Sequence, residues 1–158
     1  MPPSEAVTGG CQCGAVRYRA DSLGGSAICH CRMCQKAFGS LFGALVTAPG
    51  LVWTRGEPSW FRSSNLARRG FCAQCGTPLC YAEDDSNLEI AVGSLDDPTR
   101  APPTRQINIG SKVAFFDHLH ELPPHPHPER ETAFNAKVRS RQHPDHDTPV
   151  WPPAEGLA

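Results

Sequence analysis

The sequence predicts a mainly β domain that binds metal, and three observations support this prediction. The apolar segments are short, and several alternate with polar residues as strands do. The 158 residues include 14 glycines and 16 prolines, which argues against long helices. Most of the eight cysteines lie in close groups. Metal held by these groups would supply folding free energy that a small, loop-rich core lacks.

The overall charge and the first residues narrow the function classes. Fifteen basic and 16 acidic residues give a formal charge of −1, which does not support a general polyanion-binding surface. We therefore do not expect nucleic acid or a membrane as a partner. The first ten residues lack the apolar core of a signal peptide, and no 18-residue apolar run follows. We expect a cytoplasmic protein, in which clustered cysteines more often bind metal than form disulfides; a disulfide framework is the alternative for an exported chain.

The chain begins with a segment, residues 1–8, that we expect to be flexible. Residues 9–14 read G-G-C-Q-C-G, in which the glycines permit a turn tight enough to bring Cys11 and Cys13 together. Residues 15–20 then alternate, with Val16 and Tyr18 on one face and two arginines on the other. This alternation predicts a half-buried strand.

The middle of the chain contains further short segments with strand character. We expect strands at residues 26–29, 39–48, 51–55, 59–62, 79–82 and 87–92, a helical turn at 32–37, and last apolar segments at 106–109 and 113–116. Trp53, Trp60 and Phe61 are expected in the core, because large aromatic side chains are heavily buried on average. Beyond residue 116 histidines are scattered among prolines and charges without apolar periodicity, which predicts a disordered tail.

The central motif is C-H-C-R-M-C-Q-K, from Cys29 to Lys36. Three thiolates at this spacing can bind one zinc ion and leave its fourth tetrahedral position open, as in catalytic zinc sites. One alternative is a closed structural site, with Cys80 or His30 as the fourth ligand. Another is redox chemistry, in which an exposed cysteine of low pKa would have a resolving partner and no stoichiometric metal.

A second metal motif is G-F-C-A-Q-C-G, which contains Cys72 and Cys75. C-x-x-C followed by glycine is typical of a zinc knuckle, in which the glycine relaxes the backbone of the turn. No thioredoxin-like βαβ pattern surrounds it, which disfavours the redox interpretation. The Cys11–Cys13 pair would complete a four-cysteine structural site. Cys80 lies between apolar neighbours and is expected to be a small buried side chain rather than a ligand.

Five segments in order carry a family resemblance: GGCQCGAVRY, CHCRMCQKAFGS, FRSS, RRGFCAQCGTPL and SLDDP. The chain resembles the glutathione-dependent formaldehyde-activating enzymes, which share their domain with centromere protein V. The resemblance spans residues 9–122 and leaves 123–158 as the Pro/His-rich tail. It implies small twisted β-sheets around two zinc ions. The residues that it implies as ligands are Cys11, Cys13, Cys72 and Cys75 for a structural zinc, and Cys29, Cys31 and Cys34 for a catalytic zinc.

The resemblance implies a carbon–sulfur lyase that adds the sulfur of glutathione to formaldehyde, or reverses that addition. The catalytic zinc would bind the incoming thiol and lower its pKa; polarisation of the aldehyde oxygen is the alternative. Because glutathione carries two carboxylates, we expect nearby cations and hydroxyls to bind it. The candidates are Lys36, Arg62, Ser63, Ser64, Arg68 and Arg69, with His30 as a candidate acid/base group.

Two positions depart from the family pattern. Gln106 stands where many members have histidine, and Phe115 lies near the place of a tryptophan. A function of another class is a zinc-stabilised binding module without turnover. An open three-cysteine site beside a concave pocket would favour the enzyme, and a closed site with an exposed apolar or basic patch would favour the binding module.

Overall fold

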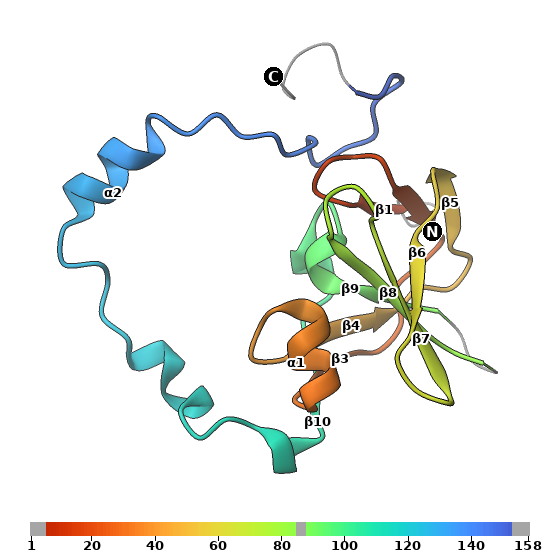
Figure 1. The fold of residues 1–158 in the computed structure, drawn as a ribbon, viewed down its shortest axis with the longest axis horizontal. Helices are drawn as coiled ribbons and strands as arrows, with labels where there is room; N and C mark the ends of the chain where they lie inside the picture. Colours follow the sequence, from red (N-terminus) through yellow and green to blue (C-terminus); the bar gives the residue numbers. More distant parts are fainter. Residues whose placement is uncertain (1–5, 85–87, 153–158) are drawn as a thin grey trace, which may run out of the picture.

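The computed structural model describes residues 6–84 and 88–152, and within them the fold is mainly β, as predicted (Figure 1). The strands form two sheets. The smaller sheet has the order β1-β2-β5 and consists of β1 (Val7–Gly10), β2 (Arg17–Ala20) and β5 (Val52–Arg55). The larger sheet has the order β10-β3-β4-β9-β8-β7-β6 and consists of β3 (Ser26–Cys29), β4 (Gly43–Thr47), β6 (Ser59–Arg62), β7 (Ala67–Phe71), β8 (Pro78–Glu83), β9 (Glu89–Ala91) and β10 (Arg105–Ile107). Neighbouring strands are antiparallel except β10 and β3.

Helices contribute little to the described residues. The α-helices are α1 (Arg32–Phe38) and α2 (Pro128–Asn135), and the 3-10 turns are η1 (Val92–Ser94), η2 (Pro98–Arg100), η3 (Ile109–Ser111) and η4 (Phe116–Glu121). No helix in the described part of the chain has the length and apolar character needed to cross a membrane. Helix α1 confirms the predicted helical turn. Residues 113–116, one of the last apolar segments, form no strand and lead into η4.

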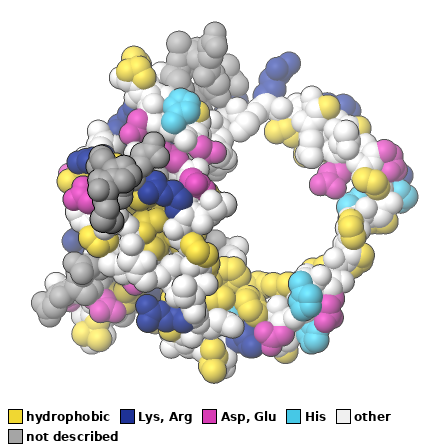
Figure 2. Space-filling view, turned by 180° about the vertical axis from the view of Figure 1, so that it is seen from behind, with side chains coloured by type: hydrophobic (Ala, Val, Ile, Leu, Met, Phe, Trp, Pro, Cys, Tyr) yellow, Lys and Arg dark blue, Asp and Glu magenta, His cyan; other side chains and the backbone are white. Residues whose placement is uncertain are grey.

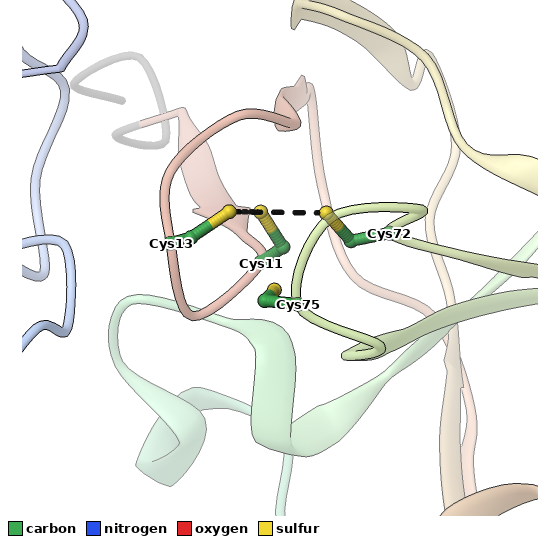
Figure 3. A group of neighbouring side chains, drawn as sticks. All are labelled: Cys11, Cys13, Cys72 and Cys75. Carbon is green, nitrogen blue, oxygen red and sulfur yellow. Dashed lines mark hydrogen bonds between the residues drawn. The ribbon is translucent and has the colours of Figure 1, made fainter.

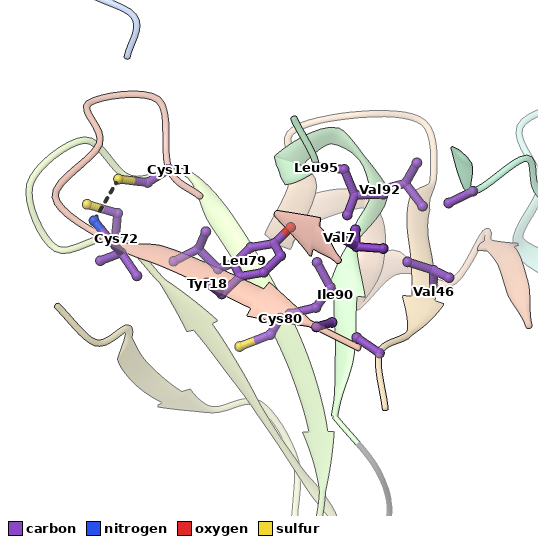
Figure 4. Packing of buried hydrophobic residues seen from close by; sticks show 14 residues of the cluster. Val7, Cys11, Tyr18, Val46, Cys72, Leu79, Cys80, Ile90, Val92 and Leu95 are labelled. Atoms are coloured by element: carbon purple, nitrogen blue, oxygen red, sulfur yellow. Dashed lines mark hydrogen bonds between the residues drawn. The ribbon is translucent and has the colours of Figure 1, made fainter. Parts of the chain in front are cut away.

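The two sheets share one hydrophobic core (Figure 4). Tyr18 of β2, Leu79 of β8 and Ile90 of β9 have no exposed surface. The Tyr18 hydroxyl lies 2.8 Å from Ser94 Oγ, so its polar end is satisfied inside the core. Trp53 and Trp60 pack against this cluster, as expected, but the prediction for Phe61 is wrong, because its side chain is 63% exposed.

One arginine of β2 is buried, although the alternating pattern placed it on a polar face. Arg17 is 3% exposed and donates two hydrogen bonds, of 2.6 and 2.7 Å, to the Asp96 carboxylate. Burial raises the pKa of Asp96, but the hydrogen bonds from Arg17 and Thr8 outweigh it and leave that pKa below its ordinary value. A buried cation is tolerated here because a carboxylate accompanies it.

Both ends of the chain differ from the sequence prediction. β1 begins at Val7, which is 2% exposed, so the last residues of the predicted flexible segment 1–8 belong to a strand; residues 1–5 lie outside the described residues. The tail was predicted to be disordered, but its described part, residues 123–152, contains α2 and makes a wide loop that returns to the core near β1 (Figures 1 and 2); residues 153–158 lie outside the described residues. His143, near the end of this loop, is 3% exposed and donates its backbone N–H to the Gln12 carbonyl at 2.7 Å.

Candidate metal centres

The four-cysteine group joins the loop between β1 and β2 to the turn between β7 and β8 (Figure 3). The sulfurs of Cys11, Cys13, Cys72 and Cys75 all lie within 4.8 Å of one another. The Sγ–Sγ distances are 3.6 Å for Cys11–Cys13 and 3.9 Å for Cys13–Cys72. Thiolates bound to one tetrahedral zinc lie about 3.8 Å apart. The group therefore fits a closed four-thiolate metal site.

Backbone geometry explains why these loops can present their sulfurs. Gly14 and Gly76 have φ angles of 80° and 76°, a region that other residues rarely adopt. The amide N–H of Val16 donates to Cys11 Sγ at 3.3 Å, and that of Gln74 donates to Cys72 Sγ at 3.4 Å. Such N–H···S bonds stabilise the negative charge of a metal-bound thiolate.

The three-cysteine group lies where β3 ends and α1 begins. Cys29 is the last residue of β3, Cys31 is the N-cap of α1, and Cys34 lies in its first turn. Their sulfurs lie within 4.8 Å of one another, and among the described residues no fourth histidine, cysteine or carboxylate joins them. Burial raises the pKa of the Cys34 thiol to about 12, although the hydrogen bond and the charge of Arg69 act to lower that pKa. A divalent cation would hold such a buried thiol in its ionised form.

Each sulfur of this group accepts a hydrogen bond from a different donor. Asn108 Nδ2 lies 3.1 Å from Cys29 Sγ, the backbone N–H of Cys34 donates to Cys31 Sγ at 3.4 Å, and Arg69 Nη2 lies 3.4 Å from Cys34 Sγ. An all-thiolate donor set with these contacts suits zinc.

A cavity of about 320 Å³ opens beside the three cysteines. Besides the cysteines it is lined by Met33, Leu45, Ser63, Ser64, Ala67, Arg69, Tyr81, Glu83, Glu89, Ile107 and Asn108. Ser63, Ser64 and Arg69 are therefore placed beside the three-cysteine group. Lys36 and Arg62 are not among the lining residues: Lys36 is exposed on α1, and Arg62 pairs with Asp84 at 2.6 Å. Arg68 also points away, with its guanidinium 4.1 Å from the centre of the Trp60 ring.

Neither residue considered as a fourth ligand joins the three-cysteine group. Cys80 is 5% exposed, packs in the core and lies outside both cysteine groups, so its prediction as a buried side chain is confirmed. His30 is fully buried; its Nε2 lies 2.8 Å from Gln106 Oε1, and its ring packs edge-to-face on Phe116. A side chain without exposed surface does not reach a substrate, so the geometry gives the His30 ring no direct acid/base role.

Sequence reasoning missed several residues of the cavity wall. Asn108, Tyr81, Glu83 and Glu89 carried no motif, and they reach the cavity only through the pairing of β8 with β9 and of β10 with β3. Asn108 lies two residues after Gln106, where many family members have histidine. This difference from the family was the one feature of the sequence that pointed to this part of the site.

Comparison with known proteins places the chain in a family. The model of the glutathione-dependent formaldehyde-activating enzymes matches residues 6–111, well over half of the sequence. The chain belongs to this family. Its fold resembles the crystal structure of a Rhodobacter sphaeroides protein, with a TM-score of 0.50 and 22% identity over 63% of this chain and 98% of the other. No curated protein sequence matches the chain.

The family assignment agrees with the cysteine geometry. Both cysteine groups lie within the matched residues. The family is associated with a small thiol substrate, and the cavity at the three-cysteine group is of the size of a small-molecule site. Residues 112–158, which include the tail, lie outside the match.

Proposed function

We propose that the protein is a zinc-dependent carbon–sulfur lyase that forms or cleaves S-hydroxymethylglutathione or a related thiol–aldehyde adduct. The observation that carries this proposal is the three-cysteine group open to a cavity, without a fourth protein ligand among the described residues. Zinc held by Cys29, Cys31 and Cys34 would lower the pKa of a substrate thiol at its open position. Cys11, Cys13, Cys72 and Cys75 would hold a structural zinc.

The reaction needs a thiolate, an aldehyde carbon and a proton donor. In the forward direction the substrate S–H loses its proton, the sulfur bonds to the formaldehyde carbon, and the carbonyl π electrons move to oxygen, which takes up a proton. We propose that Ser64, which lines the cavity, hydrogen-bonds that oxygen. Its Oγ accepts from the backbone N–H groups of Leu66 and Ala67, at 3.2 and 3.1 Å, which leaves its O–H free to donate.

The charges of the cavity match a zwitterionic thiol. Glutathione carries two carboxylates and one ammonium group. The Arg69 guanidinium and the serine hydroxyls can bind a carboxylate, while Glu83 and Glu89 can accept from an ammonium. Tyr81 Oη donates to Glu83 Oε1 at 3.2 Å and so helps to orient that carboxylate.

The open site favours an enzyme over a non-catalytic binding module. A module stabilised by zinc needs no vacant ligand position and no cavity beside it, whereas turnover needs both. We also propose a cytoplasmic location, because both cysteine groups must stay reduced to bind metal.

The test measures metal content and turnover in the same preparations. We expect two zinc ions per wild-type chain purified under reducing conditions. Cys31→Ser should stay folded with one zinc ion, and Cys72→Ser should fail to fold. NMR can follow the exchange between ¹³C-formaldehyde and its glutathione adduct. The rate of this exchange should exceed the uncatalysed rate when wild type is present, and should equal the uncatalysed rate when Cys31→Ser is present.

Cys80→Ala is the matched control, because Cys80 is a buried cysteine outside both groups. It should keep two zinc ions and the wild-type exchange rate. Exchange that persists in Cys31→Ser would disprove a role for the three-cysteine group in the reaction.

A further inference from the structure

We propose that Arg69 and Asn108 are positioning residues that keep the metal in the three-cysteine group, by compensating the charge of its thiolates. The inference rests on the metal occupancy in the proposed function and is independent of the substrate. It gives Arg69 a role towards the protein's own sulfurs, beside the contact with substrate considered above.

The burial of Arg69 is the first argument. Its side chain is 9% exposed, and its Nε is buried without a hydrogen-bond partner. No carboxylate of the described residues lies within ion-pair distance of the guanidinium. The guanidinium donates a 3.4 Å hydrogen bond to Cys34 Sγ and lies over the face of the Tyr81 ring, 5.1 Å from its centre. A buried cation without a counter-charge is strongly unfavourable. The sulfurs of the three-cysteine group supply that counter-charge when they are thiolates.

Charge bookkeeping gives the same result from the metal side. Three thiolates and one divalent cation carry a formal charge of −1, in a partly buried position. The guanidinium of Arg69 brings the unit to zero. Arg69 is held in place by strand alternation in β7, which turns Arg68 outward over Trp60 and Arg69 inward.

Asn108 supports the opposite side of the group. β10 pairs in parallel with β3, with Ile107 in register with Cys29, so the next residue, Asn108, lies beside the Cys29 sulfur. Asn108 adopts the left-handed conformation, with φ 55° and ψ 42°, and its amide donates to Cys29 Sγ at 3.1 Å. Asparagine is one of the few residues that adopt this conformation readily.

These contacts should determine how tightly the group retains its metal. Hydrogen bonds to metal ligands orient them and draw charge from them, and their loss typically lowers metal affinity about 10–100-fold. The backbone donor to Cys31 stays in every variant, so removal of Arg69 or Asn108 should weaken the site without destroying it.

The first experiment is chelator competition on zinc-loaded protein. Arg69→Met should release one of its two zinc ions at a chelator concentration about 10–100-fold below that for wild type, and hold the other unchanged. Arg68→Met is the matched control: the same substitution in the neighbouring residue of the same strand should release both ions as wild type does. Wild-type retention in Arg69→Met would overturn the inference, as would a wild-type chain whose metal content Cys31→Ser does not lower.

Asn108 provides an independent test if Arg69→Met does not fold. Asn108→Gly keeps the left-handed backbone and removes the donor, whereas Asn108→Asp replaces the donor with a negative oxygen. Release should therefore be easier from Asn108→Asp than from Asn108→Gly, and easier from both than from wild type. The reverse order would contradict the proposal.

A spectroscopic readout separates this role from a general loss of structure. With Co²⁺ in place of zinc, loss of an N–H···S bond raises the energy of the sulfur lone pair, so the sulfur-to-cobalt charge-transfer band should move to longer wavelength in Arg69→Met and stay in Arg68→Met. An unmoved band in Arg69→Met would refute the contact. Both readouts need no substrate, so they can succeed where the formaldehyde exchange fails, and fail where it succeeds.

Discussion

Glu89 is a cavity residue whose ionised side chain is unfavourable for folding, and we propose that it contributes to substrate binding. Its carboxylate is half-buried on the cavity wall, and burial, followed by repulsion from Glu83, raises its pKa above the ordinary 4.5. At neutral pH the folded state therefore holds an ionised group less favourably than the unfolded chain does. An ammonium group of the substrate would offset this cost.

We predict that Glu89→Gln stabilises the free protein and weakens its binding of glutathione. The thermal midpoint should rise at pH 7, where Glu89 is ionised, and this gain should disappear below about pH 4.5, where the carboxyl is protonated in both states. The KM for glutathione should rise about tenfold or more, because a hydrogen bond between charged groups contributes roughly 1.5–3 kcal/mol. Calorimetry and steady-state kinetics measure the two effects.

A thiol without an amino group is the control for this prediction. The KM for 3-mercaptopropionate should be the same for wild type and Glu89→Gln. An equal rise for both thiols would show that Glu89 does not recognise the ammonium group.

At the residue scale, the sequence predicted what local spacing decides. The seven cysteines lie in the two expected groups: cysteines two or three residues apart constrain one another, and the Cys11–Cys13 pair was the remaining partner for Cys72 and Cys75. Asn108 and Glu89 were not found, because only strand pairing brings them to the cysteines. Lys36 and Arg62 were proposed because they are close in sequence, but the strand and helix directions turn them away from the cavity.

At the scale of elements, the contact between β7 and β8 depends on a glycine. Gly70 pairs with Cys80, and a Cβ at position 70 would lie 2.4 Å from Cys80 Sγ and 3.0 Å from Pro58 Cβ. Only glycine allows the two strands this approach. The same two strands carry Arg69 and Tyr81, so the contact also fixes one wall of the cavity.

We predict that Gly70→Ala destabilises the protein by about 1–3 kcal/mol, the usual cost of overpacking a core. Cys80→Ala removes the atom with the closest contact, so the double variant Gly70→Ala/Cys80→Ala should recover part of that loss. Urea unfolding of the four proteins in the double-mutant cycle measures the coupling. Additive effects would show that the cost of Gly70→Ala does not come from its contact with Cys80.

The sequence of β7 explains why this strand could not be predicted. Its residues A-R-R-G-F lack the alternation of apolar and polar side chains that marks a half-buried strand. Both faces carry an arginine: Arg68 covers Trp60 from the solvent side, and Arg69 faces the sulfur of Cys34. Because the two arginines are identical in type but differ in environment, the sequence shows no alternation that would mark a strand. β3, β6 and β8, in contrast, were predicted nearly to their bounds.

At the scale of the whole molecule, the far end of the tail packs against the segment that carries Cys11 and Cys13. Asp147 accepts from Arg17 at 2.7 Å, and Trp151 Nε1 donates to the Cys13 carbonyl at 2.7 Å. A Cβ on Gly14 would lie 2.1 Å from the His143 ring. These contacts hold the loop that carries Cys11 and Cys13. The composition of the tail predicted disorder, because the residues that make these contacts are isolated in the sequence and follow no apolar periodicity.

We predict that a chain ending at Gln142 is less stable than one ending at Pro152. The shorter chain loses several hydrogen bonds to the core, each with a net value of roughly 0.5–1.5 kcal/mol, while it regains the entropy of the free tail. The thermal midpoint should fall by about 2–8 °C, and chelator should remove zinc faster from the four-cysteine group. Because the two chains differ only in residues 143–152, release from the three-cysteine group, resolved by its own kinetic phase, should be unchanged. Equal midpoints and equal release from the four-cysteine group would show that the tail rests on the core without stabilising it.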